Sequence, residues 1–130
     1  MRKCDVIKKL TELVLLDYNW NLNGAVPIFP ECIRNAKLIL DYISEKNVNF
    51  IINNLKSDFL RPQSDGTIQI DFEFPTKGDA YDFGLTLEIL PTRINYTIFK
   101  NDVEHVNNVS YSNQSFDQIL DILTGLRLIV

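Results

Sequence analysis

The amino-acid sequence predicts an α+β domain, a two-layer sandwich in which two N-terminal helices and one C-terminal helix pack on an antiparallel sheet of four to five strands. Apolar residues recur with helical spacing in the N-terminal third and again near the C-terminus. Between these regions apolar and polar residues alternate, as in half-buried strands. Short turn-forming segments separate the alternating stretches, so consecutive strands are expected to pair antiparallel. The length of 130 residues fits one domain, 1–130.

Two helices are expected before the sheet. The first covers residues 3–16, because Val6, Leu10 and Leu13 recur at helical spacing. The second begins at Pro30, whose missing N–H costs nothing in the first turn of a helix. It ends near Lys46-Asn47, and its predicted buried stripe consists of Ile33, Ala36, Leu40 and Ile43.

The strands are predicted from alternation with a period of two. Ile68, Ile70, Phe72 and Phe74 are expected to face the core, and the segment 83–90 repeats the pattern with Phe83, Leu85, Leu87 and Ile89. Shorter or weaker strands are expected over 59–61, 94–98 and 103–109, and residues 48–55 fit either a strand or a helical turn. Ser64-Asp65-Gly66 and Pro91-Thr92-Arg93 are expected to be turns.

A capping box predicts where the C-terminal helix begins. In Ser115-Phe116-Asp117-Gln118, the hydroxyl of Ser115 would accept a hydrogen bond from the backbone N–H of Gln118. Gly125 is expected to weaken or end this helix. Its predicted apolar face consists of Phe116, Ile119, Leu120 and Leu123.

The charge pattern argues against nucleic-acid binding. The net charge is −4 and the isoelectric point is about 4.9, whereas nucleic-acid binders usually carry a basic face. Residues 1–64 carry nine basic and seven acidic groups, and residues 65–130 carry four and ten. The acidic half either favours a basic partner or simply keeps the protein soluble. The sequence has no signal peptide and no membrane span, so we expect a cytoplasmic protein.

No catalytic, cofactor or metal site is predicted. His105 is the only histidine, and no nucleophile motif or glycine-rich phosphate loop accompanies it. Asp71, Glu73 and Glu88 are expected on one sheet face, either as a solvated surface or around a hard cation. Cys4 and Cys32 are expected to be free thiols, unless the first two helices bring them close enough for a disulfide.

The segment 18–29 is the most unusual part of the sequence. Its candidate binding residues are Tyr18, Trp20, Asn21 and Asn23, because aromatic and asparagine side chains are favoured in recognition loops. The alternative is a structural role, in which Trp20 is a buried plug closed over by Leu22, Val26 and Ile28. The asparagines would then cap backbone groups, and Gly24 would adopt a positive φ.

The same segment carries a resemblance. Asn19-Trp20-Asn21, Gly24-Ala25 and Pro27-Ile28 resemble a recurring stretch in small uncharacterised bacterial proteins, which follow it with a Pro-x-x-Asp-Gly-x-Ile strand start. Here the second element is Pro62 to Ile68. Such proteins often have Gly where Leu22 stands in this chain. The resemblance covers about a fifth of the sequence and implies no activity and no catalytic residues.

Two functions from different classes remain open at this point. The first is a non-enzymatic interaction module that binds one protein partner, as an antitoxin, an immunity protein or a small chaperone does. The second is a small-molecule or divalent-cation binding domain. An enzyme is the least favoured class, because the sequence offers no recognisable arrangement of reactive groups.

Overall fold

The structure is a computed structural model that describes residues 3–45, 58–74, 83–100 and 103–129. In chain order the elements are α1 (Lys3–Leu13), α2 (Pro30–Glu45), β1 (Leu60–Pro62), β2 (Ile68–Phe74), β3 (Phe83–Ile89), β4 (Arg93–Lys100), β5 (Val103–Ser110) and α4 (Asn113–Ile129). The predictions for residues 48–55, for the loop 75–82 and for the turn at 101–102 lie outside the described residues.

The five strands form one sheet in the order β1-β2-β3-β4-β5, and every neighbouring pair is antiparallel. The register aligns the predicted inward rows, since Ile70 lies opposite Leu87 and Leu87 lies opposite Tyr96. A shift by one residue would turn each of these side chains to the other face. The α+β fold expected from the sequence is therefore confirmed, with five strands.

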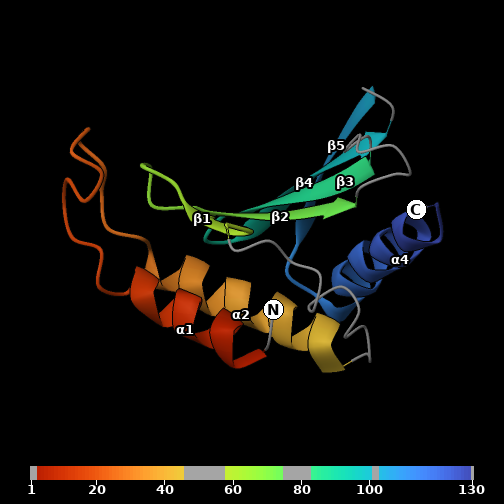
Figure 1. Ribbon diagram of the computed structural model, residues 1–130, viewed down its shortest axis with the longest axis horizontal. Helices are drawn as coiled ribbons and strands as arrows, with labels where there is room; N and C mark the ends of the chain where they lie inside the picture. The colour runs from red at the N-terminus through yellow and green to blue at the C-terminus, as the bar shows by residue number, and fades with distance from the viewer. Residues whose placement is uncertain (1–2, 46–57, 75–82, 101–102, 130) are drawn as a thin grey trace.

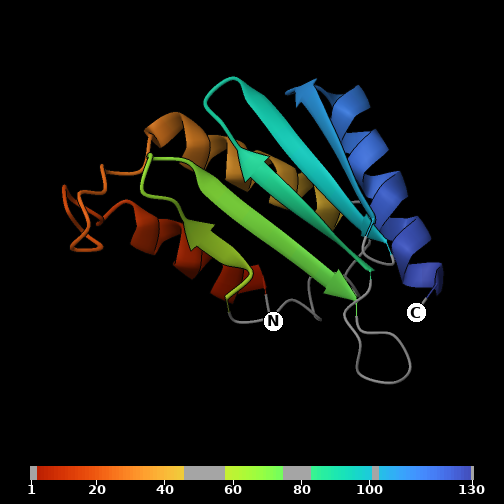
Figure 2. The same ribbon diagram turned by 90° about the horizontal axis from the view of Figure 1, so that it is seen from above.

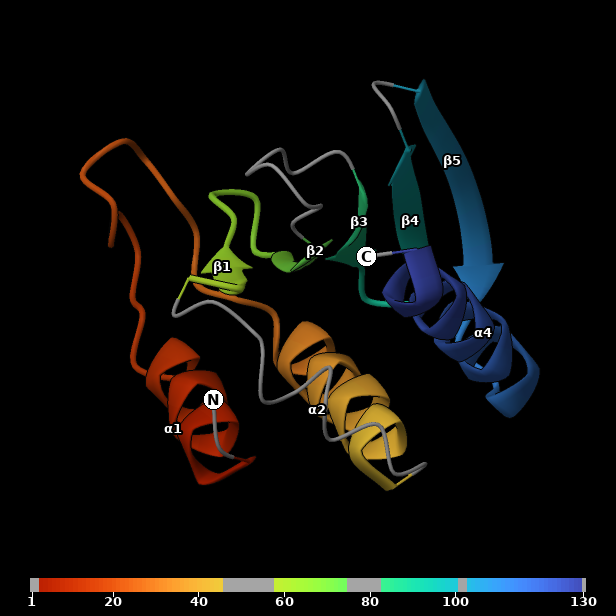
Figure 3. The ribbon, with the colours of Figure 1, turned by 45° about the vertical axis from the view of Figure 1, so that its right-hand side comes forward.

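The three helices α1, α2 and α4 cover one face of the sheet (Figures 1 and 3). No described element covers the other face, which Figure 2 shows in front. The core lies between the two layers and includes the inward residues of β2, β3 and β4, which are at most 1% exposed: Ile68, Ile70, Phe72, Leu85, Leu87, Ile89, Ile94 and Tyr96.

The helices α1 and α2 form an antiparallel pair joined by a long loop, residues 14–29 (Figure 1). Helix α1 ends at Leu13 and not at residue 16. The N–H groups of Val14, Leu15 and Leu16 donate to carbonyls three residues earlier, which is the pattern of a tight turn and not of an α-helix. In α2 the fully buried stripe is Cys32, Ala36, Ile39 and Ile43, with Leu40 beside it. Ile33 packs against the core but is only half-buried and faces a groove beside α1, so it lies at the edge of the core and not in the fully buried stripe that the sequence predicts.

Helix α4 begins one turn earlier than the predicted capping box. The N–H of Ser115 donates to the hydroxyl of Ser112 (3.2 Å), and the N–H of Phe116 donates to the carbonyl of Ser112 (3.0 Å). Ser112 is therefore the N-cap and Ser115 occupies the third helical position. The helix continues past Gly125 to Ile129, because glycine lowers helix propensity by about 1 kcal/mol without removing a backbone donor.

Candidate functional site

The loop between α1 and α2 projects beyond the end of the sheet, as the orange segment in Figure 1 shows. Three of its residues have a positive φ: Asn19 (60°), Leu22 (62°) and Gly24 (80°). Glycine and asparagine adopt this conformation readily, whereas it is uncommon and strained for leucine. Leu22 therefore stands at a position whose backbone conformation favours glycine.

Asparagine side chains hold the loop in shape. The Oδ1 atom of Asn19 accepts from the N–H of Gly24 (2.8 Å). The Oδ1 atom of Asn21 accepts from the N–H groups of Asn23 (2.9 Å) and Ala25 (3.2 Å). The expected capping role is confirmed for Asn19 and Asn21, because these side chains satisfy backbone donors that the turns leave open.

Trp20 combines features of both roles considered for it. Its indole Nε1–H donates to the carbonyl of Val26 (2.8 Å), and its ring packs against the core while remaining half-buried. The apolar side chains expected to close over Trp20 do so only in part, because Ile28 is buried but Leu22 is 85% exposed. Trp20 therefore fastens the two arms of the loop together without being sealed from solvent.

The loop is also fastened to the turn between β1 and β2. The N–H of Val26 donates to the carbonyl of Ser64 (3.0 Å), and the N–H of Phe29 donates to the carbonyl of Gly66 (2.9 Å). The turn is itself braced, since the carboxylate of Asp65 accepts from the backbone N–H of Thr67 (3.1 Å). The loop and the β1–β2 turn, which are far apart in the sequence, thus hold each other in place.

The loop exposes large apolar and aromatic side chains. Tyr18 is 75% exposed, Leu22 is 85% exposed and Leu15 is 80% exposed. Tyr18 was selected from the sequence, whereas Leu22 was expected to cover Trp20 and Leu15 to continue a helix. The signal that would have identified Leu22 is its place among turn-forming residues, where an outward side chain is common.

A groove of about 690 Å³ runs between α1 and α2 and ends at the loop. The side chains of Leu10 and Ile28, which are buried, line its inner part. Its walls follow helical spacing on both sides. One wall consists of Ile7 and Thr11 on α1 with Val14 just past the end of that helix, and the other consists of Ile33, Arg34 and Lys37 on α2. Sequence reasoning missed this groove, because the angle between the two helix faces is set by tertiary packing.

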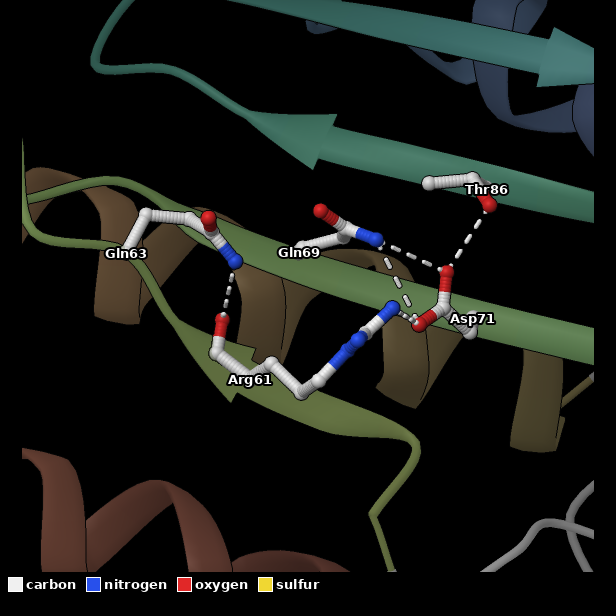
Figure 4. Close-up of polar contacts among 5 residues, drawn as sticks. All are labelled: Arg61, Gln63, Gln69, Asp71 and Thr86. Carbon is white, nitrogen blue, oxygen red and sulfur yellow. Dashed lines mark hydrogen bonds and ion pairs between the residues drawn. The ribbon is translucent and has the colours of Figure 1, made fainter.

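The carboxylate of Asp71 on the open sheet face is fully engaged (Figure 4). It forms an ion pair with Arg61 on β1 and accepts from the hydroxyl of Thr86 (2.8 Å) and the amide of Gln69 (3.1 Å). The backbone carbonyl of Arg61 also accepts from Gln63 (3.4 Å). A hard cation at Asp71 would have to compete with a guanidinium that already neutralises the charge.

A second polar chain crosses the same face over β3, β4 and β5. The amide of Asn95 donates to Glu88 (3.3 Å), Asn108 donates to Asn95, and Arg93 donates to Asn108. Glu88 therefore lies on the face that the sequence predicted for it, whereas the side chain of Glu73 lies outside the described residues. Within the described part of the chain, no three metal-ligating side chains converge on one point.

Two described side chains that could act as nucleophiles, Cys32 and Tyr111, have raised pKa values. Burial, with the nearby carboxylates of Glu31 and Asp65, raises the pKa of the Cys32 thiol to about 11. Cys32 is a free thiol, so it forms no disulfide with Cys4. Burial also raises the pKa of Tyr111, whose hydroxyl donates to the carbonyl of Leu90 (2.7 Å). The side chain of His105 lies outside the described residues.

Fold and site together define an α+β domain with an open polar sheet face, a braced projecting loop and an apolar groove. Comparisons with protein-family models, with curated proteins and with solved structures each find no match. None of the helices in the described ranges is both long and apolar enough to cross a membrane.

Proposed function

We propose that this chain is a non-enzymatic interaction module that binds one protein partner through its projecting loop, as an antitoxin, immunity protein or small chaperone does. The observation that carries this proposal is Leu22. Its side chain is 85% exposed on a backbone with a φ of 62°. A leucine in this conformation costs about 1–2 kcal/mol relative to the right-handed region. The turn holds the backbone in this conformation, but the leucine side chain gains no burial that offsets the cost, so a role for the side chain in binding accounts for it.

The loop is suited to binding because it is organised before a partner arrives. Asn19 and Asn21 satisfy its backbone donors, and Trp20 joins its two arms at Val26. A braced loop loses little conformational entropy on association, so more of the contact energy contributes to affinity. Tyr18 and Leu22 then supply exposed apolar area at fixed positions.

The four residues selected from the sequence have different tasks in this proposal. Tyr18 contacts the partner, whereas Trp20 and Asn21 hold the loop in the shape that presents Tyr18 and Leu22. Asn23 is exposed, and its backbone N–H is bound by Asn21. The expectation of a basic partner rests on the acidic second half of the chain and stays a prediction.

The test is a quantitative pull-down from the native cell, with the tagged wild-type chain and single-site variants as baits. Leu22→Gly removes the side chain and relieves the backbone strain, and Tyr18→Ala removes the exposed ring. Leu38→Ala is the matched control, because Leu38 is a half-exposed residue of α2 outside the loop. Melting curves of every bait establish that each one is folded.

We expect wild type and Leu38→Ala to capture one and the same protein. The affinity for that protein should fall about thirtyfold with Leu22→Gly, the effect of a hot spot worth about 2 kcal/mol. Equal capture by all four baits would refute a binding role for the loop. Such a result would leave the groove and the open sheet face as the surfaces to examine.

A second candidate function is the binding of a small molecule, which the groove favours. Its volume of about 690 Å³ lies within the range of ligand sites, and its lining is mostly apolar with two cationic groups. Divalent-cation binding has less support, because Asp71 is already paired with Arg61. A thermal-shift screen with metabolites and divalent cations separates these options from the protein-binding proposal.

A further inference from the structure

The structure assigns the α1–α2 groove a specific occupant: we propose that it receives an amphipathic helix of the partner, with acidic side chains along one edge of the apolar stripe. This inference rests on the proposed protein-binding function and adds the chemistry of the bound segment. It concerns a surface next to the projecting loop, because Leu16, Pro27 and Pro30 form the loop end of the groove.

The shape of the groove matches a helix. Ile7, Thr11 and Val14 recur along one wall, and Pro30, Ile33 and Lys37 recur along the other. Each wall is therefore a ridge of side chains with helical spacing. A third helix can pack between the two ridges, as helices pack in bundles. The wall from Ile7 to Val14 is about 10 Å long, which corresponds to about two helical turns.

The exposure of the α1 wall favours a helix over a small ligand. Val14 remains 64% exposed and Ile7 remains 44% exposed, although both line the groove. A small molecule held beside Leu10 and Ile28 would leave much of this outer apolar surface in water. A helix about 10 Å in diameter would cover both side chains at once.

The charges specify which helix fits. Arg34 and Lys37 lie one turn apart on the α2 wall, whereas the α1 wall presents the neutral Ile7, Thr11 and Val14. Among the described residues, neither Arg34 nor Lys37 makes an ion pair or a side-chain hydrogen bond. Two unpaired cations along one edge of an apolar groove attract carboxylates on one edge of the bound stripe.

The experiment uses three fluorescein-labelled synthetic peptides and fluorescence anisotropy. The first peptide is an amphipathic helix with a leucine stripe edged by glutamates. The second replaces the glutamates by lysines, and the third has the composition of the first in an order without a stripe. Oleate is tested as a competitor, because a long-chain carboxylate shares the apolar and anionic chemistry of the first peptide.

The decisive variant is the charge reversal Arg34→Glu with Lys37→Glu, because both side chains are exposed and lie outside the core. The matched control is Lys8→Glu with Lys9→Glu, which changes the net charge equally on α1 outside the groove lining. Val14→Asp tests the apolar wall. Melting curves confirm that each variant is folded before its binding is measured.

The proposal expects wild type to bind the glutamate peptide at least tenfold more tightly than the lysine and reordered peptides. The charge reversal should reverse that preference, and the control should change the dissociation constant less than threefold. Val14→Asp should weaken the glutamate peptide, because it places a charge in the apolar wall. Reversal of preference is the decisive result, because a folding defect would weaken both peptides.

Three results would overturn the inference. Equal binding of the glutamate and lysine peptides would remove the charge argument. Binding of oleate without binding of either stripe peptide would assign the groove to a small ligand. A dimer in solution that Val14→Asp dissociates would assign it to a second copy of this chain. In each case, capture of a native partner that depends on Leu22 would leave the proposed function standing.

Discussion

The backbone N–H of Phe29 donates to the carbonyl of Gly66 at 2.9 Å, and the ring of Phe29 lies too close to Gly66 to leave room for a Cβ there. This contact joins the end of the projecting loop to the turn between β1 and β2. The contact holds the C-terminal end of the loop, at Phe29, against the rest of the domain and leaves only the tip of the loop free. The position and stiffness of the proposed binding surface depend on it.

The first prediction concerns Gly66. A Cβ there would lie 2.9 Å from the Phe29 ring and 3.1 Å from the carbonyl oxygen of Pro27, on a backbone with a φ of +89°. We expect Gly66→Ala to lower the free energy of unfolding by about 2–3 kcal/mol, from backbone strain and overpacking together. Denaturant unfolding measures this loss.

Gly24→Ala is the control for Gly66→Ala. Gly24 has a similar φ of +80°, but nothing lies within 4 Å of a Cβ placed there. Only the backbone term remains, so we expect a loss of about 1 kcal/mol. Equal losses for the two variants would mean that Phe29 does not restrict Gly66.

The second prediction concerns the stability of the loop itself. We expect Leu22→Gly to raise the free energy of unfolding by about 0.5–1 kcal/mol, because relief of the positive φ exceeds the extra entropy that glycine gives the unfolded chain. Leu15→Gly is the control, because Leu15 is equally exposed but has no positive φ. The control should be destabilised, and a loss of stability in both variants would contradict the strain at Leu22.

The third prediction places the start of α4. Ser112→Ala should cost about 1 kcal/mol, because the N–H of Ser115 then loses its acceptor. Ser115→Ala should cost less, since alanine is a better helix former and the cap at Ser112 remains. Thermal melts of the two variants compare the costs directly. A greater loss of stability for Ser115→Ala than for Ser112→Ala would mean that Ser115 is the N-cap, as the sequence predicts.

The fourth prediction tests the inward face of the sheet. Phe72 is 1% exposed between the sheet and the helices, so Phe72→Ala should cost about 3–5 kcal/mol. Leu38→Ala removes a half-exposed side chain and should cost less than about 1 kcal/mol. Guanidinium unfolding of both variants is the measurement, and a loss below about 1 kcal/mol at Phe72 would contradict its burial.

The fifth prediction concerns the thiol of Cys32 in a Cys4→Ser background, where Cys32 is the only thiol. Because the folded pKa is about 11, the thiol should react far more slowly with iodoacetamide at pH 8 in the folded than in the unfolded chain.

The same raised pKa has a consequence for stability. The unfolded thiol loses its proton near pH 8.5–9 while the folded thiol retains it up to about pH 11. The contribution of Cys32 to the free energy of unfolding is therefore complete below about pH 8.5 and declines as the pH rises toward 11. A Cys32→Ala variant should lack this part of the pH dependence, which denaturant unfolding between pH 8 and pH 11 would detect.

The sequence by itself determined the elements whose periodicity reports burial directly. Alternation at Ile68, Ile70 and Phe72 identified the inward face of β2, because successive strand residues point to opposite faces. The asparagine caps were also predictable, since Asn19 and Asn21 act on neighbours within five residues. These features depend on local geometry, which the order of residues specifies.

Tertiary structure alone decided the features that depend on how the elements meet. Ile33 has the spacing of a core residue, but the packing of α1 against α2 turns it toward a groove. Ser112 caps α4 where Ser115 had an equally good motif, because the end of β5 fixes where the chain turns. The contact of Phe29 with Gly66 joins residues far apart in sequence. Sequence periodicity describes one element at a time, whereas these positions follow from the register and angle between elements.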